Sequence, residues 1–193
     1  PFLSQWSHIT LDQWVLSTIA RGYTLQFRSP PISRPPPGHS TVDPSHLPLL
    51  QQEVGRLLSL GAIEGVPREF RGKGFYSRYF LIPKAKGGLR PLLDLRGLNR
   101  FMVKYQFRMV SLVKIIPALD PGNWYAALDL QDAYFHIHIF KGHRRFLRFL
   151  VGQDHYQFTV LPFGLSTAPR VFTKCMAVVA AFLRRRGVQL FPY

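Results

Sequence analysis

Hydrophobic positions recur at helical spacing in three parts of the chain. The first pattern predicts a short amphipathic helix over residues 10–20, with Gly22 at its end. The second pattern predicts a helix between Pro48 and Gly61. Proline suits the first turn of a helix, and glycine suits the left-handed conformation that ends one. The third covers residues 168–186, whose last turn holds three arginines that complement the helix dipole. Such stripes are typical of helix faces that pack on a core.

Two apolar runs, residues 75–83 and 89–95, have the pattern of neighbouring strands. Residues 84–88 between them contain two lysines and two glycines. Because glycine readily takes the positive φ of a tight loop, the pattern predicts a hairpin with a basic tip.

The remaining pattern predicts further short strands. Residues 124–139 are rich in β-forming residues, and residues 146–151 and 156–160 alternate apolar and polar positions. We also expect a short helix over residues 112–119 and a strand over residues 188–193. Helices and short strands mixed in this way indicate an α+β protein.

A proline-rich segment, residues 30–46, interrupts these patterns. It holds too many prolines for a helix or a central strand, so we interpret it as an extended connector; a ligand for an SH3-type domain is the alternative. It divides the chain into a leader, residues 1–29, and a main body, residues 47–193.

The amino-acid composition limits the classes of partner and the cellular compartment that we expect for this protein. The chain has 25 Lys and Arg against 10 Asp and Glu, a formal net charge of +15, which favours a polyanionic partner such as nucleic acid. A ribosomal or membrane-surface protein would also be basic. The single cysteine excludes an internal disulfide, and no signal peptide or membrane-spanning run is recognisable, so we expect an intracellular protein of the cytoplasm or nucleus, without a membrane partner. Because the chain begins with Pro1, we expect a processed or missing N-terminus.

One carboxylate lies in a notable context. Asp129 is embedded in the apolar, β-forming segment LDLQDAYFHI, residues 128–137. A buried aspartate needs a partner, and phosphoryl-transfer enzymes supply one by placing carboxylates on Mg²⁺. A hydrogen-bonded structural aspartate is the alternative interpretation.

Three segments occur in a fixed order: LLDLRGLN at residues 92–99, LDLQDAYFHI, and LPFGLSTAPRVF at residues 161–172. Together with the basic hairpin, they closely resemble the successive motifs of reverse transcriptases, over about residues 47–193. The segment WSHITLDQWVLSTIARGYTLQF with the proline-rich connector resembles the leader of DIRS-type retroelements, which favours a DIRS-type or Ty3-gypsy-like origin.

The resemblance implies a right-hand polymerase fold of the α+β class, with fingers and a partial palm, a small antiparallel sheet packed on helices, and no thumb. The fingers would cover about residues 47–105 and 137–168, and the palm about residues 106–136 and 169–193.

It also implies roles for single residues. Asp129 would be the first metal-binding aspartate, and the backbone carbonyl of Leu130 would bind the same pair of Mg²⁺ ions, with Mn²⁺ as an alternative. The backbone of Asp132 and Ala133 would cradle the triphosphate of a dNTP. Strand alternation agrees, because it turns Asp132 to the face opposite Asp129. Tyr134 would be the steric gate against a 2′-hydroxyl; core packing is its alternative role.

In the hairpin, Arg90 and Lys84 would grip the triphosphate, with Lys86 as a substitute for Lys84. Gly164 would let the backbone approach the nucleotide. Phe163 stands where retroviral enzymes commonly have glutamine, which removes one polar contact.

The remaining matches concern the template and primer. Asp94, Arg96 and Pro169 would contact them, although an Asp94–Arg96 pair that braces the sheet is equally compatible with the pattern. Arg144, Arg145 and Arg148 could follow a nucleic-acid backbone or form a solvated strand face.

Tyr193 matches the tyrosine of the Tyr-x-Asp-Asp turn that presents the second carboxylate in the family. We therefore expect a polymerase segment truncated before those aspartates, which does not polymerise by itself. Its partners would be an RNA or DNA template with a primer, and dNTPs. A non-catalytic nucleic-acid-binding remnant of a retroelement is the alternative function; a ribosomal protein fits the charge but not the motifs.

Overall fold

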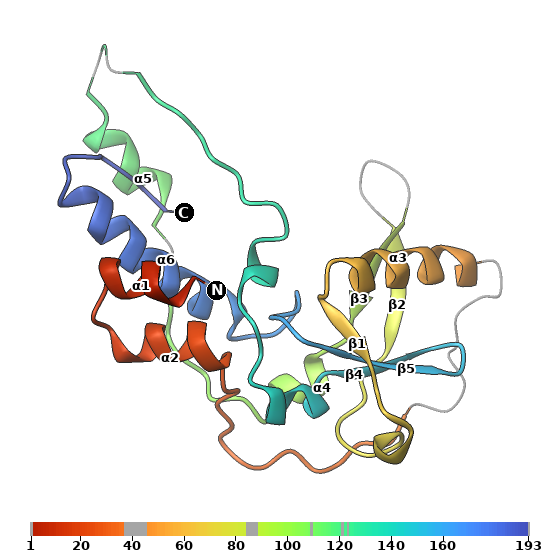
Figure 1. The fold of residues 1–193 in the computed structure, drawn as a ribbon. Coiled ribbons are helices and arrows are strands. Elements are labelled where there is room, and N and C mark those ends of the chain that lie inside the picture. Colours follow the sequence, from red (N-terminus) through yellow and green to blue (C-terminus); the bar gives the residue numbers. More distant parts are fainter. Residues whose placement is uncertain are drawn as a thin grey trace.

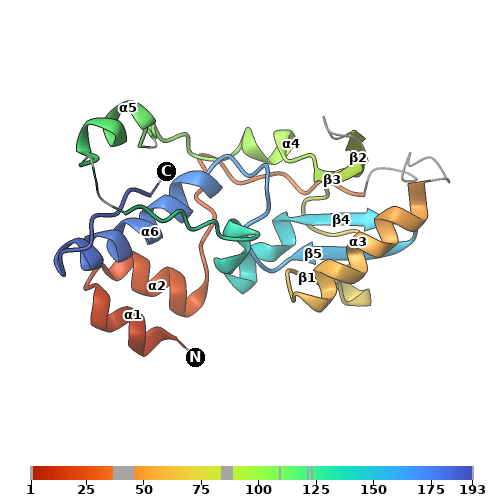
Figure 2. The same cartoon turned by 90° about the horizontal axis from the view of Figure 1, so that it is seen from above.

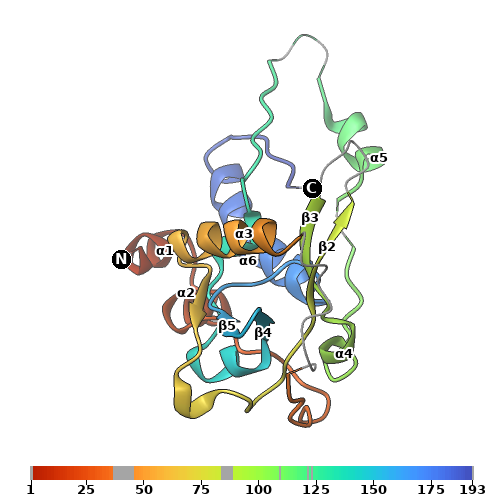
Figure 3. The ribbon, with the colours of Figure 1, turned by 90° about the vertical axis from the view of Figure 1, so that its right-hand side faces the viewer.

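Two antiparallel sheets and one long helix form one side of the molecule (Figure 1). The computed structural model describes residues 2–36, 46–83, 89–108, 110–120, 122 and 124–192. The first sheet has the strand order β1-β5-β4, and the second pairs β2 with β3. Helix α3 packs on β1 and β4 through Leu50, Val54 and Leu57 (Figure 3). The elements are α3 (Leu47–Ser59), β1 (Ile63–Gly65), β2 (Tyr79–Pro83), β3 (Leu89–Leu93), β4 (Arg148–Val151) and β5 (Asp154–Phe158).

A second group of helices lies on the other side, as the view from above shows (Figure 2). It comprises α1 (Leu3–Ile9), α2 (Gln13–Arg21), α5 (Leu112–Ile115) and α6 (Ala168–Arg184). Asp12 caps α2 by accepting hydrogen bonds from the backbone N–H groups of Trp14 and Val15, and Gly22 ends it at φ 88°. The predicted leader helix is confirmed, and α1 precedes it.

Short helical turns lie between the longer elements. They are η2 (Arg68–Phe70), α4 (Arg96–Asn99), η3 (Ile116–Ala118), η4 (Ala133–His136) and η5 (Lys141–Phe146). Among the described residues, no helix has the length and apolarity needed to cross a membrane.

The core joins the leader to the main body. Tyr23 and Leu25 of the leader are buried in the same cluster as Leu98, Leu147 and Phe149. Tyr23 also forms a parallel bridge with Ile139. The leader therefore completes the core and is not a detached tail in this structure.

The structure confirms the predicted hairpin, with β2 and β3 paired from Tyr79 to Leu93, and the two alternating segments, which form β4 and β5. The short strands predicted within residues 124–139 are not formed. Residues 124–130 form a plain coil, and only His138 and Ile139 make isolated bridges. Residues 188–192 are not a strand either. A strand needs a backbone partner, and the described residues provide none for either segment.

Candidate nucleotide site

The turn at Asp132 is the conformationally unusual point of the chain. Among the described residues, Asp132 is the one non-glycine with positive φ, at 48°, and it begins the η4 turn. The alternation that predicted opposite faces for Asp129 and Asp132 is therefore wrong here, because no strand continues through both residues. Instead, Asp132 lies in a turn that leads directly into η4.

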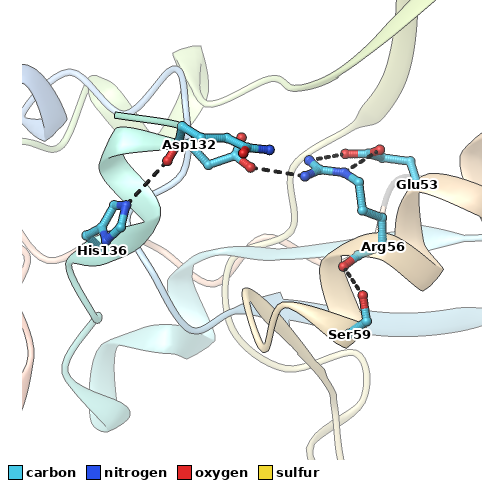
Figure 4. A network of polar contacts seen from close by, with 6 residues as sticks. Glu53, Arg56, Ser59, Asp132 and His136 are labelled. Carbon is cyan, nitrogen blue, oxygen red and sulfur yellow. Dashed lines mark hydrogen bonds and ion pairs between the residues drawn. The ribbon is translucent and has the colours of Figure 1, made fainter. Parts of the chain in front are cut away.

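A salt-bridge network ties this turn to helix α3 (Figure 4). Arg56 Nη1 lies 3.1 Å from Asp132 Oδ2, and the same guanidinium binds Glu53 through Nη2–Oε1 at 2.8 Å and Nε–Oε2 at 3.0 Å. Hydrogen bonding to Glu53, and next to Asp132, raises the pKa of Arg56. Sequence reasoning missed Arg56, because nothing local relates it to a residue 76 positions later.

A pocket of about 180 Å³ opens beside this network. Its polar wall contains Glu53, Arg56 and Asp132, and its apolar wall contains Leu92, Phe135 and Phe163. The pocket therefore brings together α3, the hairpin, the Asp132 turn and the LPFG segment, which are separate in sequence.

Aromatic rings cover the neighbouring surface. The Tyr134 ring lies 5.0 Å from Phe163 and 5.8 Å from Phe172, measured between ring centroids. Phe163 is 47% exposed, and Tyr134 is half-buried. Tyr134 thus packs in an aromatic cluster, as its alternative role requires, while it remains next to the pocket-lining Phe163.

Gly164 is held by an asparagine that sequence reasoning did not select. Asn99 Nδ2 donates to the Gly164 carbonyl oxygen at 2.8 Å, and Asn99 Oδ1 accepts from Ser166 N at 2.9 Å. Gly164 has φ 90°, which favours glycine, and an added Cβ would lie 3.4 Å from the carbonyl oxygen of Leu93. Asn99 therefore links the LLDLRGLN and LPFGLSTAPRVF motifs, and Pro169 stands in the first turn of α6.

Asp94 and Arg96 form an ion pair with each other, as in the second of the two roles considered for them, the first being contact with the template or primer. Arg96 Nη2 donates to Asp94 Oδ2 at 2.8 Å, and Nε donates to Oδ1 at 2.9 Å. This bonding lowers the pKa of Asp94. Because the two residues are neighbours in one short turn, the pair stabilises that turn and does not bridge the strands.

The proposed metal ligands are not among the residues that line the pocket. Asp129 is exposed in the 124–130 coil, and Leu130 next to it is 46% exposed. Within the described part of the chain, no three His, Cys, Asp or Glu side chains are close enough to hold a metal ion. The described residues therefore do not by themselves form a complete metal site.

The hairpin residues are described only in part. Arg90 lies in β3 opposite Ile82 of β2, near the end of the hairpin. Lys84 and Lys86 lie outside the described residues. Ala133 opens the η4 turn directly after Asp132.

The predicted basic cluster separates into three different environments. Arg148 is only 5% exposed and donates to the carbonyl oxygens of Phe70 and Lys73, so its placement on a solvated or nucleic-acid-facing surface is wrong. Arg144 pairs with Glu64 at 3.0 Å, and Arg145 is exposed. Arg148 can be buried at this strand position because backbone carbonyl oxygens accept hydrogen bonds from its charged guanidinium.

Comparison with known proteins decides the family. Residues 82–193 match the family model described as reverse transcriptase (RNA-dependent DNA polymerase). The chain belongs to the reverse transcriptase family. The matched residues include the Asp129–Tyr134 segment, the LPFG turn and most of the hairpin.

Several polyproteins are similar to this reverse transcriptase chain. The genome polyprotein of Petunia vein clearing virus (isolate Hohn) is 28% identical over 138 residues, which cover 72% of this chain and 6% of the polyprotein. The Retrovirus-related Pol polyprotein from transposon 412 of Drosophila melanogaster is 27% identical over 177 residues, which cover 89% of this chain and 13% of the polyprotein. The chain thus spans a small part of these relatives.

The fold is also that of a reverse transcriptase. The crystal structure of native Prototype Foamy Virus Protease-Reverse Transcriptase matches with a TM-score of 0.64 at 20% identity, covering 87% of this chain and 22% of that one. The expected α+β polymerase fold is confirmed. The DIRS-type assignment of the leader stays a prediction.

Proposed function

We propose that this chain contributes the fingers and part of the palm to an RNA-directed DNA polymerase of a retroelement. The main support is the pocket, which is lined by residues of the Asp132 turn, of the turn that contains Phe163 and of the hairpin strands. The chain that forms it belongs to the reverse transcriptase family. Family membership supports the reaction class, and the pocket supports the place where a dNTP would bind.

In this reaction, the 3′-hydroxyl oxygen of a primer attacks the α-phosphorus of a dNTP. The new P–O bond extends the primer, the bond to pyrophosphate breaks, and the hydroxyl proton leaves to solvent. We infer that the backbone of Asp132 and Ala133 binds the triphosphate, with Arg90 and Lys84 approaching from the hairpin. Tyr134 would lie beneath the sugar.

The proposed reaction depends on divalent metal. Bound Mg²⁺ would neutralise charge that develops on the phosphate, and Asp129 with the Leu130 carbonyl provides oxygen ligands of the type it prefers. The described residues lack the other carboxylates of a two-metal site. These would come from a strand that pairs with residues 124–130, so we expect no primer extension by the 193-residue polypeptide alone.

The test is primer extension on an RNA template by a polypeptide that continues from these residues through the rest of the polymerase. We expect Asp129→Asn to reduce kcat by about 1000-fold or more, because metal ligation is lost. Asp154→Asn is the matched control, since Asp154 is also exposed but lies at the start of β5. Extension that survives Asp129→Asn would contradict the assignment of Asp129.

A second function is a nucleic-acid-binding remnant without catalysis. It is favoured by one observation, the formal net charge of +15, which suits a polyanionic partner with or without catalysis. The same assay separates the two functions. If the longer polypeptide binds template and primer but does not extend the primer in Mg²⁺ or Mn²⁺, the second function is correct.

A further inference from the structure

A loop at the far end of the fingers has features that the polymerase reaction does not use. Residues 66–74, which we call the basic loop, connect β1 to the segment that leads into β2. The loop lies at the lower edge of the molecule in Figures 1 and 3, and the strands β2 and β3 lie above it.

Buried side chains fix the backbone of the basic loop from below. Arg148 Nη1 donates to the Phe70 carbonyl oxygen at 2.7 Å and also to that of Lys73, while its Nε donates to Gln157 Oε1 at 3.0 Å. Tyr76 Oη accepts from Gly72 N at 3.2 Å. These contacts hold the backbone of the loop, so the backbone itself need not be ordered when a ligand binds.

The outer surface of the basic loop is cationic around one aromatic ring. Arg68, Arg71 and Lys73 are exposed, and Phe70 between them is 49% exposed. Glu69 is the only acidic residue of the loop. In the described part of the chain, no salt bridge involves any of these three cations.

A fourth cation joins this surface from η5. The Arg145 carbonyl oxygen accepts from Phe75 N at 2.9 Å, and a Cβ on Gly74 would collide with that oxygen. Gly74, at φ 90°, therefore allows the backbone that carries exposed Arg145 to lie directly against the loop.

The electrostatic surroundings agree with a concentrated positive potential. Burial first, and then Arg71 and Arg148, lower the pKa of His155, whose Nδ1 lies 2.8 Å from Tyr76 Oη. The pKa of Arg148 is lowered by burial and, among other contributions, by Arg145. Cations from η5 and from the loop thus act on the same small region.

We propose that the basic loop is a binding site for single-stranded nucleic acid, with Phe70 stacking on a base and Arg68, Arg71, Lys73 and Arg145 binding phosphates. Exposed aromatic rings among cations are the usual platform for unpaired strands, because every base has a face that can stack. A duplex keeps its bases stacked on one another, so Phe70 would discriminate against it. The site is separate from the nucleotide pocket, and the proposal does not depend on the proposed polymerase function.

The experiment measures fluorescence anisotropy of labelled oligouridylate and oligodeoxythymidylate of 12 nucleotides with the 193-residue protein, without metal or dNTP. We expect Phe70→Ala to weaken binding about tenfold. Phe2→Ala is the matched control, because Phe2 is also an exposed phenylalanine but lies at the N-terminal end of α1. Equal affinities of the two variants would overturn the stacking role, and an equal Phe70→Ala effect on a 12-base-pair duplex would overturn the single-strand assignment.

Charge is tested separately. The triple variant Arg68→Gln, Arg71→Gln, Lys73→Gln should reduce the slope of log K against log salt by about 2, because about 0.7 is lost for each phosphate contact. Arg184→Gln, Arg185→Gln, Arg186→Gln removes the same charge from the end of α6 and should leave the slope nearly unchanged. An equal loss in both triple variants would mean unspecific attraction and would overturn the site.

Phe70, Phe2 and the three cations of the basic loop are exposed, so thermal unfolding of those variants should match the parent protein. The α6 triple variant also removes the hydrogen bonds from Arg184 to the Leu190 carbonyl oxygen, so its unfolding is measured alongside its binding. RNA and DNA should respond alike to Phe70→Ala if stacking dominates. A loss confined to RNA would overturn stacking as the main contact, since it would require recognition of the 2′-hydroxyl.

Discussion

The region predicted to form the fingers and the segment predicted to belong to the palm differ in how they satisfy their backbone hydrogen bonds. In the predicted fingers, β5 pairs with both β1 and β4, and Phe149 is completely buried against Tyr79, Tyr156 and Phe158. The predicted palm segment, residues 124–130, is also rich in apolar residues, yet Trp124 is 100% and Leu128 is 88% exposed. The difference shows that apolar, β-forming residues make a strand only when another strand is available to pair with them.

The comparison can be tested most strongly by deleting one large side chain from each region. Phe149→Ala should lower the free energy of unfolding by about 3–5 kcal/mol, because it leaves a cavity in a closed core. Trp124→Ala should change it by less than about 0.5 kcal/mol. Denaturant unfolding followed by circular dichroism measures both; a large effect of Trp124→Ala would mean that the palm segment is packed in solution.

A buried cation of the fingers gives the next largest effect. Arg148→Met should destabilise the protein by about 2–3 kcal/mol, because the carbonyl oxygens of Phe70 and Lys73 lose their donor. Its exposed neighbour provides the control, since Arg145→Met should have little effect on unfolding. If Arg148→Met proved as stable as the parent, water would have to replace the guanidinium at both carbonyls.

The contact between the two regions should contribute less. Arg56→Met removes the link from α3 to the Asp132 turn, and we expect a loss of about 1 kcal/mol because the pair is partly exposed. Arg56→Lys keeps the charge but lacks the planar fork, so its stability should be intermediate. Thermal unfolding compares the three proteins, and a Lys variant no better than the Met variant would show that geometry, not charge, matters.

The smallest effect concerns the Asp94–Arg96 pair. The pKa of Asp94 in the folded protein is lower than its ordinary value of 3.8. The Asp94 carboxylate therefore stabilises the fold fully at pH values above 3.8, and this contribution is lost as the pH falls through the folded-state pKa. Asp94→Asn should therefore be slightly less stable than the parent at pH 6 and indistinguishable from it once Asp94 is protonated. Unfolding curves across this pH range provide the measurement; a difference that persists in strong acid would have another cause.

Prediction from sequence succeeded where the signal is local. Helix α3, the hairpin strands and α6 lie close to the expected residues, because helical spacing, alternation and glycine ends act within a few positions. Strand β1 was missed, since Ile63–Gly65 is too short to show alternation. The left-handed Asp132 was missed as well, because the β-forming residues around it indicated a strand.

The sequence alone determined the order of the motifs, the family and most of the regular elements, since each depends on neighbouring residues. Only the tertiary structure decided which distant residues meet. Arg56 reaches Asp132 across 76 positions, Asn99 reaches Gly164 across 65, and Arg148 turns inward to carbonyls 75 and 78 positions earlier. The physical reason is that a charge or an amide finds its partner through the packing of whole elements, and that packing leaves no periodic trace in the chain.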